Sequence, residues 1–210
     1  MFNLDVEEKV TKNYERLVEF VEQDSRSEEI KKLFEVLNDE LITAPASGKT
    51  YFHNCFPGGY LDHVLRVIDN AIRLSPLYKE MGGEIDFTKQ ELIFSAMMHD
   101  LGKLGTEEGP YYVDSDDWQK KRNEYYTQNR NIQYFKAPER GLMMLQKHGI
   151  TITEKEWLAI RLSDGMYDEG AKSYLMNYSP YAMKTSLPYI IHWADHMASQ
   201  SENDMSRFSF

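Results

Sequence analysis

The sequence predicts an all-α protein that folds as a single domain of about seven to nine helices. Apolar residues recur three and four positions apart along most of the chain, which is the spacing of one helix face. Helix-capping patterns open several of these segments, and no stretch of convincing length alternates apolar and polar residues as a strand does. The length of 210 residues fits one domain, and an apolar content of 41% is sufficient for a sizeable core.

Two helices are predicted in residues 1–43, and we expect both to pack on the remainder of the chain. The apolar face of the first helix includes Leu17 and Val21. Ser25, with Glu28 three residues later, has the pattern of a capping box and opens the second helix, whose apolar stripe continues to residue 41. The next segment, residues 43–57, contains two prolines and one glycine without a sustained period, so we predict a loop there.

The central part of the chain is predicted to contain two further helices. Apolar residues at helical spacing place the first over residues 59–74, and the pair of glycines at residues 82–83 indicates a turn. Thr88 and Glu91 form another capping pattern, which opens a strongly apolar helix that we expect to end near Gly102.

The periodicity weakens over residues 106–136, where we predict a long loop with one short helix around Trp118. Pro138, at a first-turn position, opens the following helix, and Gly149 ends it. A capping box at Thr153 opens the next helix, and a glycine-containing loop follows it.

Pro188 begins a final long helix. The chain as a whole is predicted to form one domain over residues 1–210. Within it we distinguish N-terminal helices over residues 1–43, a core over residues 44–199 and a polar tail over residues 200–210.

The chain is acidic overall: it contains 24 lysine and arginine residues and 34 aspartate and glutamate residues, which gives a net charge of −10. A long nucleic-acid duplex and a membrane surface are therefore poor partners, whereas a small anion can still bind where a metal ion and a few cations dominate one pocket. The single cysteine, Cys55, excludes an internal disulfide and fits a reducing compartment. No apolar run approaches the roughly 20 residues that span a bilayer. We expect a cytoplasmic protein, and the sequence leaves its oligomeric state open.

Two histidines and two aspartates are the candidates for chemistry. His99 and Asp100 are adjacent at the end of an apolar helix, and His63 lies on a helix whose other face is core. Asp195 lies in the apolar stretch 190–197, where a buried carboxylate is costly unless it is paired or binds a metal. Two imidazoles and two carboxylates form a mixed nitrogen and oxygen site, which suits Mn, Fe, Co, Ni or Zn better than Mg. From periodicity alone, however, a histidine on an apolar helix is more often a core residue.

Three segments, in the same order, resemble the HD-domain metal-dependent phosphohydrolases. Residues 56–66 read Phe-Pro-Gly-Gly-Tyr-Leu-Asp-His-Val-Leu-Arg, and the family often has Gly-Gly-Leu-Leu-Glu-His there. Residues 96–103, Ala-Met-Met-His-Asp-Leu-Gly-Lys, resemble its central His-Asp-x-Gly-Lys signature. Residues 191–198, Ile-His-Trp-Ala-Asp-His-Met-Ala, resemble its closing helix, which supplies the last aspartate. The resemblance covers roughly residues 44–199 and implies a helical HD-domain bundle.

The resemblance implies that His63, His99, Asp100 and Asp195 bind one divalent transition metal ion. It also implies that Asp100 orients or deprotonates the attacking water and that Lys103 holds a phosphate oxygen. We therefore predict hydrolysis of a phosphoester or phosphoanhydride in a small nucleotide or a short oligonucleotide. Phosphomonoesterase, phosphodiesterase and nucleotide triphosphohydrolase activities all remain open.

Many members of the family carry further histidines for a second metal ion, and the corresponding residues 136–140 and 160–165 contain none. A second ion is therefore not expected, although Asp164 is a candidate substitute ligand. Three further residues are candidates for contacting the substrate: His53, which matches a histidine of the family, Arg140 and Arg161. A loop histidine bonded to backbone is an equally good interpretation of the first, and surface salt bridges are the more frequent role of such arginines.

Two other functions remain open at this point. A degenerate HD scaffold that lacks the second-metal histidines can serve as a non-catalytic module that binds a nucleotide or a partner. Some HD-fold proteins use a di-iron centre for oxygen chemistry, which requires the ligands that are missing here.

Overall fold

Helices dominate the computed structural model, which describes residues 4–177 and 182–208. Within these residues lie ten α-helices, seven of them at least eight residues long, so the prediction of an all-α fold is confirmed. Four strands of two or three residues form two small antiparallel sheets. The elements are α1 (Leu4–Glu22), α2 (Ser27–Val36), α3 (Asn38–Thr43), α4 (Gly59–Glu80), α5 (Lys89–Met98), the 3₁₀ turn η1 (Leu101–Lys103), β1 (Gly105–Thr106), β2 (Gly109–Pro110), β3 (Tyr112–Asp114), α6 (Asp117–Lys120), β4 (Tyr126–Gln128), α7 (Ala137–Lys147), α8 (Glu154–Arg161), the 3₁₀ turn η2 (Gly165–Tyr167), α9 (Glu169–Leu175) and α10 (Leu187–Phe208).

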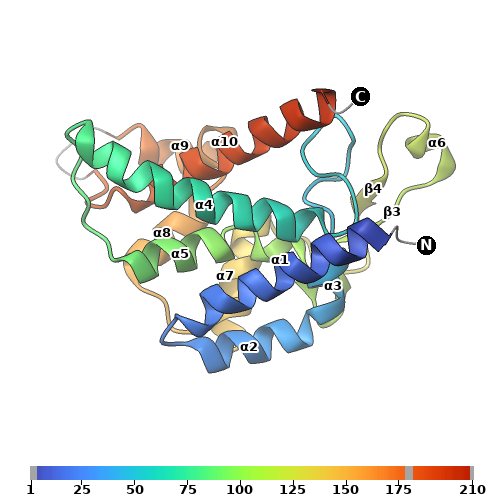
Figure 1. Ribbon diagram of the computed structural model, residues 1–210, viewed down its shortest axis with the longest axis horizontal. Coiled ribbons are helices and arrows are strands. Elements are labelled where there is room, and N and C mark those ends of the chain that lie inside the picture. The colour runs from blue at the N-terminus through green and yellow to red at the C-terminus, as the bar shows by residue number, and fades with distance from the viewer. Residues whose placement is uncertain (1–3, 178–181, 209–210) are drawn as a thin grey trace.

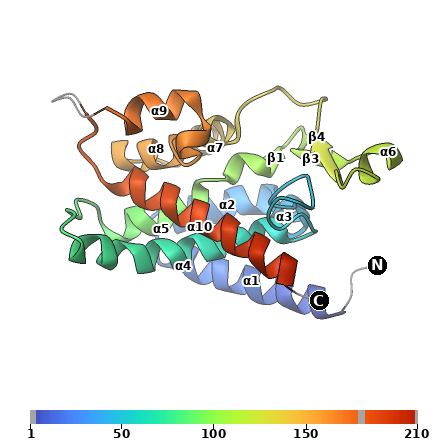
Figure 2. The ribbon, with the colours of Figure 1, turned by 90° about the horizontal axis from the view of Figure 1, so that it is seen from above.

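The two longest helices, α4 and α10, pack against each other near the middle of the molecule (Figure 1). Helices α7, α8 and α9 lie on one side of α10, and α1 lies on the other side, next to α4 (Figure 2). Helices α1 and α3 both contact α4, so the N-terminal segment packs on one member of this central pair.

Helix α5 is the most deeply buried element, because residues 92–98 are all buried. It packs against α4, α8 and α10, and a helix that is apolar on every side is expected to be surrounded by protein. The residues that follow it, His99 and Asp100, therefore lie at the centre of the fold.

Local sequence signals start several helices where they were predicted. Thr88 caps α5 and Thr153 caps α8, each through a reciprocal capping box with the glutamate three residues later. A proline lies in the first turn of α7, and Gly149 leaves that helix with a φ of 72°. The short helix around Trp118 is α6.

The second N-terminal helix differs from the prediction. Ser25 does not cap it, since α2 begins at Ser27 after Arg26, which makes no side-chain capping bond. The helix also breaks at Leu37, whose φ of −106° and ψ of 19° are not helical. The apolar stripe therefore continues across two helices, and Leu41 belongs to α3.

Helix α4 continues six residues beyond the predicted end at residue 74, with Pro76 inside it. Pro76 and Ile72, one turn earlier, are both exposed, so the Ile72 carbonyl that lacks its usual N–H donor lies on the solvent-facing side of the helix.

Two segments predicted as loops have regular structure. The strands β1 to β4 lie within residues 105–128, where runs of two or three residues are too short to show an alternating pattern. Helix α9 follows Asp168, whose carboxylate accepts a hydrogen bond from the backbone N–H of Gly170 at 3.2 Å.

The prediction of a polar tail over residues 200–210 is wrong for residues 200–208, which continue α10. Glu202 is only 3% exposed. Its carboxylate faces inward, where it contacts the buried His63 and the half-buried Arg66 on α4.

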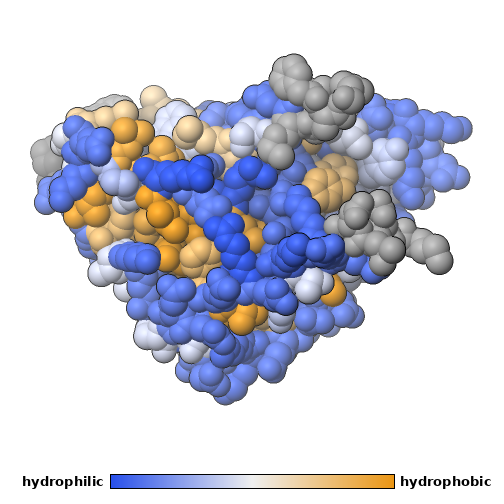
Figure 3. All heavy atoms as spheres, in the orientation of Figure 1, coloured by the Kyte–Doolittle hydropathy of each residue, from blue (hydrophilic) through white to orange (hydrophobic). Residues whose placement is uncertain are grey.

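The surface agrees with the acidic, polar composition. The face in Figure 3 is mainly hydrophilic, with an apolar area over α4, whose C-terminal half exposes Ile72 and Leu77. None of the described helices is long and apolar enough to cross a membrane.

Candidate metal centre

The structure brings together His63 from α4, His99 and Asp100 from the end of α5, and Asp195 from α10; we call these four residues the cluster. Nε2 of His63 lies 3.1 Å from Oδ1 of Asp195 and 3.7 Å from Oδ2 of Asp100. Nε2 of His99 lies 3.5 Å from Oδ2 of Asp100 and 3.8 Å from Oδ1 of Asp195. The two imidazoles thus face the same pair of carboxylates.

Both imidazoles of the cluster are fully buried, and hydrogen bonds hold the nitrogen that points away from the cluster. Nδ1 of His99 donates to the backbone carbonyl of Ala96 at 2.8 Å, and Nδ1 of His63 lies 3.1 Å from Oε2 of Glu202. Because a carbonyl only accepts, the lone pair of His99 is on Nε2. Among the described residues, neither Nε2 atom has a hydrogen-bond partner.

Such buried nitrogens are rare without a ligand, since an unsatisfied polar atom costs free energy. Burial alone lowers the pKa of His63, but the carboxylates of Glu202 and Asp195 raise that pKa to about 10. A proton on His63 would therefore satisfy this ring and Asp195. It would leave Nε2 of His99 without a donor, whereas one cation between the rings satisfies both.

The carboxylates of the cluster are ionised. Burial would raise the pKa of Asp100, but the Lys103 ammonium at 2.6 Å and His99 lower it. Burial likewise opposes ionisation of Asp195, and His63 and His99 bring its pKa well below the usual range. One nitrogen of each imidazole and one carboxylate oxygen of Asp195 lie within 4.8 Å of one another, which makes them a candidate donor set for a divalent transition metal ion, with the Asp100 carboxylate beside them.

The approach of α7 to η1 depends on Gly102. A Cβ atom at this position would lie 2.0 Å from the carbonyl oxygen of Ala137 and 2.9 Å from Cβ of Arg140. Only glycine therefore lets the turn that carries Asp100 and Lys103 pack against the start of α7.

We expect Gly102→Ala to lower the free energy of unfolding by about 1–3 kcal/mol, because the methyl group must displace backbone. The matched control is Gly141→Ala, which also faces η1 but from within α7. There the nearest atoms lie 3.4 Å from the new Cβ, and alanine is the better helix former. Urea unfolding checks both variants, and equal stabilities would contradict this account of Gly102.

A cleft of about 320 Å³ opens beside the cluster. Asp195 and Lys103 lie in its lining, and the ammonium of Lys103 is cationic because Asp100 raises its pKa against the effect of burial. The remaining lining residues are Phe52, His53, Asp164, Tyr167, His192, His196, Ser199, Gln200 and Asn203.

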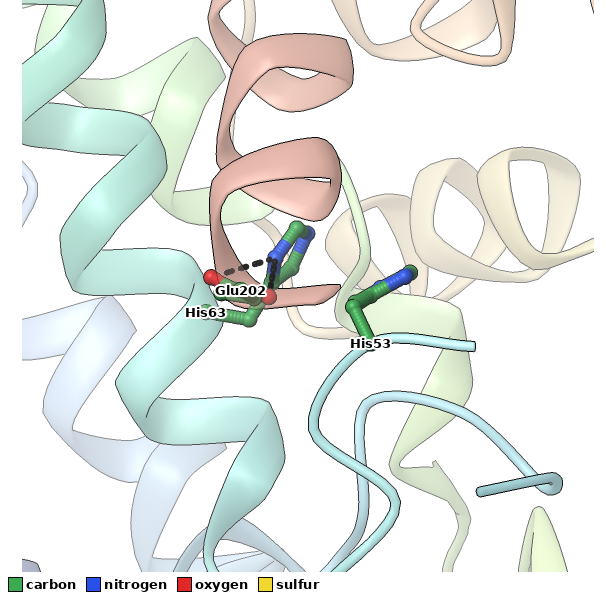
Figure 4. Close-up of side chains that lie close together, drawn as sticks. All are labelled: His53, His63 and Glu202. Carbon is green, nitrogen blue, oxygen red and sulfur yellow. Dashed lines mark hydrogen bonds and ion pairs between the residues drawn. The ribbon is translucent and has the colours of Figure 1, made fainter. Parts of the chain in front are cut away.

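His53, for which the sequence left a substrate contact and a backbone-bonded loop histidine open, lies beside the cluster. Its ring centroid lies 4.6 Å from that of His63, and Figure 4 shows it on a loop opposite Glu202. Burial, followed by repulsion from His63, lowers the pKa of His53 to about 3, so the ring is neutral. Its Nε2 is buried and makes no hydrogen bond with the described part of the chain.

The structure does not bring Arg140 and Arg161 to the cleft. Arg140 is buried beneath η1, where its guanidinium donates to the backbone carbonyls of Gly102 at 3.3 Å and Gln133 at 2.7 Å. Arg161 forms ion pairs with Glu139 at 3.1 Å and with Asp168 at 2.8 Å. Within the described residues neither arginine lines the cleft, so the prediction that they contact substrate has no support in their positions.

Asp164 does line the cleft, and burial together with the Asp100 carboxylate raises its pKa. Sequence reasoning named it as a substitute ligand but missed Glu202 entirely. A signal for Glu202 was available, because it follows Asp195 by seven residues and therefore lies two turns later on the same helix face.

The fold and the cluster define an all-α protein in which His63, His99 and Asp195 could hold a metal ion, with Asp100 beside them. No protein-family model, no curated protein and no solved structure matches this chain. The function must therefore be inferred from the site.

Proposed function

We propose that this protein is a metal-dependent phosphohydrolase of the HD-domain kind that acts on small nucleotides or short oligonucleotides. The cluster would hold one divalent ion of Mn, Fe, Co, Ni or Zn. One observation carries the proposal: two buried imidazole nitrogens without hydrogen-bond partners face two ionised carboxylates beside an open cleft. When bound, such an ion lowers the pKa of a water ligand and neutralises charge on a phosphoryl oxygen.

The residues around the cluster have chemistry that suits a phosphate ester. Asp100 is ionised and accepts a hydrogen bond from the attacking water, which orients it. Lys103, three residues later, offers a cation to a phosphate oxygen at the edge of the cleft. Neutral His53 lies against His63 and can donate to or accept from the substrate.

A nucleotide fits the remaining features of the cleft. Phe52 is 50% exposed and Tyr167 is 76% exposed, and both line it. Exposed aromatic rings stack on nucleobases without requiring one base identity. The cleft volume of about 320 Å³ suits a small ligand, and the net charge of −10 disfavours a long polynucleotide.

The test is an activity screen on protein stripped of metal with a chelator. Each divalent ion is added separately, and nucleoside monophosphates, nucleoside triphosphates, cyclic dinucleotides and short oligonucleotides are offered as substrates. We expect hydrolysis that depends on a transition metal ion and stops on addition of the chelator. Tight nucleotide binding without turnover under any ion would contradict the proposal and favour a non-catalytic binding module.

A further inference from the structure

Glu202 lies against the side of His63 that points away from the cluster. Its two carboxylate oxygens are 3.1 and 3.2 Å from Nδ1 of His63, and its side chain is almost fully buried. Figure 4 shows the two residues reaching toward each other from α4 and α10. We propose that Glu202 is a positioning residue that orients His63 and increases the affinity of the cluster for its ion, an inference that rests on the proposed function.

An ion could bind on either side of the His63 ring, at Nδ1 or at Nε2. His53, His63 and Glu202 also offer three donor atoms within 4.8 Å of one another. Nε of Arg66, however, donates to Oε1 of Glu202 at 3.1 Å, so a positive charge already occupies that side. The opposite side has two ionised carboxylates and the Nε2 atom of His99. The ion therefore belongs on the Nε2 side, and Glu202 accepts a hydrogen bond from Nδ1.

This hydrogen bond has three consequences for His63. When an ion takes the place of the proton on Nε2, this hydrogen bond keeps the remaining ring proton on Nδ1, so the lone pair of Nε2 faces the cluster. It fixes the rotation of the ring, and it makes Nε2 a stronger donor to a cation, because a carboxylate polarises the imidazole. Nδ1 of His99, in contrast, donates its hydrogen bond to an uncharged group, the backbone carbonyl of Ala96. His63 is therefore the imidazole whose strength as a ligand depends on an acidic partner.

A chain of ion pairs holds Glu202 in place. Arg66, which lies on α4, also contacts Asp62 one helical turn earlier, with Nη2 of Arg66 3.5 Å from Oδ2 of Asp62. Asp62 in turn contacts Nζ of Lys9 on α1 at 2.8 Å. The carboxylate of Glu202 on α10 is thus linked through two residues of α4 to Lys9 on α1.

The experiment compares the divalent-metal affinity of the whole protein with that of Glu202→Gln and Glu202→Ala, measured with Zn²⁺ and Co²⁺ in competition with a chelator. The control is Glu80→Gln, which removes one exposed carboxylate at the far end of α4. We expect affinity to fall about tenfold in Glu202→Gln, whose amide oxygen still accepts from Nδ1, and about 100-fold in Glu202→Ala. Glu80→Gln should bind as the unchanged protein does, and the Co²⁺ absorption spectrum should change only in the Glu202 variants.

Thermal unfolding of each variant separates this role from a contribution to folding alone. Glu202→Asp, which keeps the charge but withdraws it from Nδ1, provides a second test if Glu202→Ala does not fold, and it should also bind more weakly. Unchanged affinity in a folded Glu202 variant would overturn the inference while leaving the proposed function intact. Absence of divalent binding by the unchanged protein would overturn both.

Discussion

Hydrolysis by Asp100→Ala is expected to fall by about 10³-fold or more relative to the unchanged protein, because one side chain has two roles. Oδ2 of Asp100 lies 3.7 Å from Nε2 of His63 and 3.5 Å from Nε2 of His99, so its loss removes one carboxylate of the cluster. The same group would orient the attacking water. The loss also leaves the ammonium of Lys103 without the carboxylate at 2.6 Å that holds it.

The measurement is kcat on whichever substrate is turned over in the screen, with the metal content of each protein determined alongside. Asp100→Asn preserves the shape of the side chain and separates loss of charge from loss of packing. The control is Asp117→Ala, which removes an exposed carboxylate from α6. Unchanged activity in Asp100→Ala would remove the cluster as the catalytic site.

Arg26→Ala is expected to lower the free energy of unfolding by about 3–5 kcal/mol, the cost of leaving buried carboxylates without their cation. Nε of Arg26 lies 2.8 Å from Oδ1 of Asp24, and Nη2 lies 2.8 Å from Oε1 of Glu156. Asp24 is 7% exposed and Glu156 only 1%. The guanidinium also packs on the ring of Phe94, 3.7 Å from its centroid. A protein of this length should show a Tm lower by about 10 °C.

The comparison is with Arg16→Ala, which removes an arginine paired with Asp69 at the surface, where both side chains are substantially exposed. Such a pair contributes less than about 1 kcal/mol, because water and salt screen it. Urea unfolding at neutral pH measures both variants. If Arg26→Ala destabilises the protein no more than Arg16→Ala does, the network around Arg26 does not join the N-terminal helices to α8.

Several elements could be predicted because their causes are local. The capping boxes of Thr88 and Thr153 join residues three positions apart, and the apolar face of a helix depends on neighbours three and four positions away. The strongly apolar run before His99 likewise required a buried helix at that point. These patterns were sufficient for the all-α prediction and for the placement of most helices.

The sequence by itself supplied four candidate ligands, two histidines and two aspartates at the ends or within apolar helices, and the resemblance to HD-domain proteins, not their periodicity, favoured a metal site over a core role. Only the tertiary structure decided that they converge, because Asp195 comes from a helix far along the chain from His63. It also decided the positions of the other candidates. Arg140 satisfies carbonyls beneath η1, and Glu202, expected in a tail, is buried against a histidine 139 positions earlier. Partners so distant in sequence leave no local periodic signal, because packing between helices selects them.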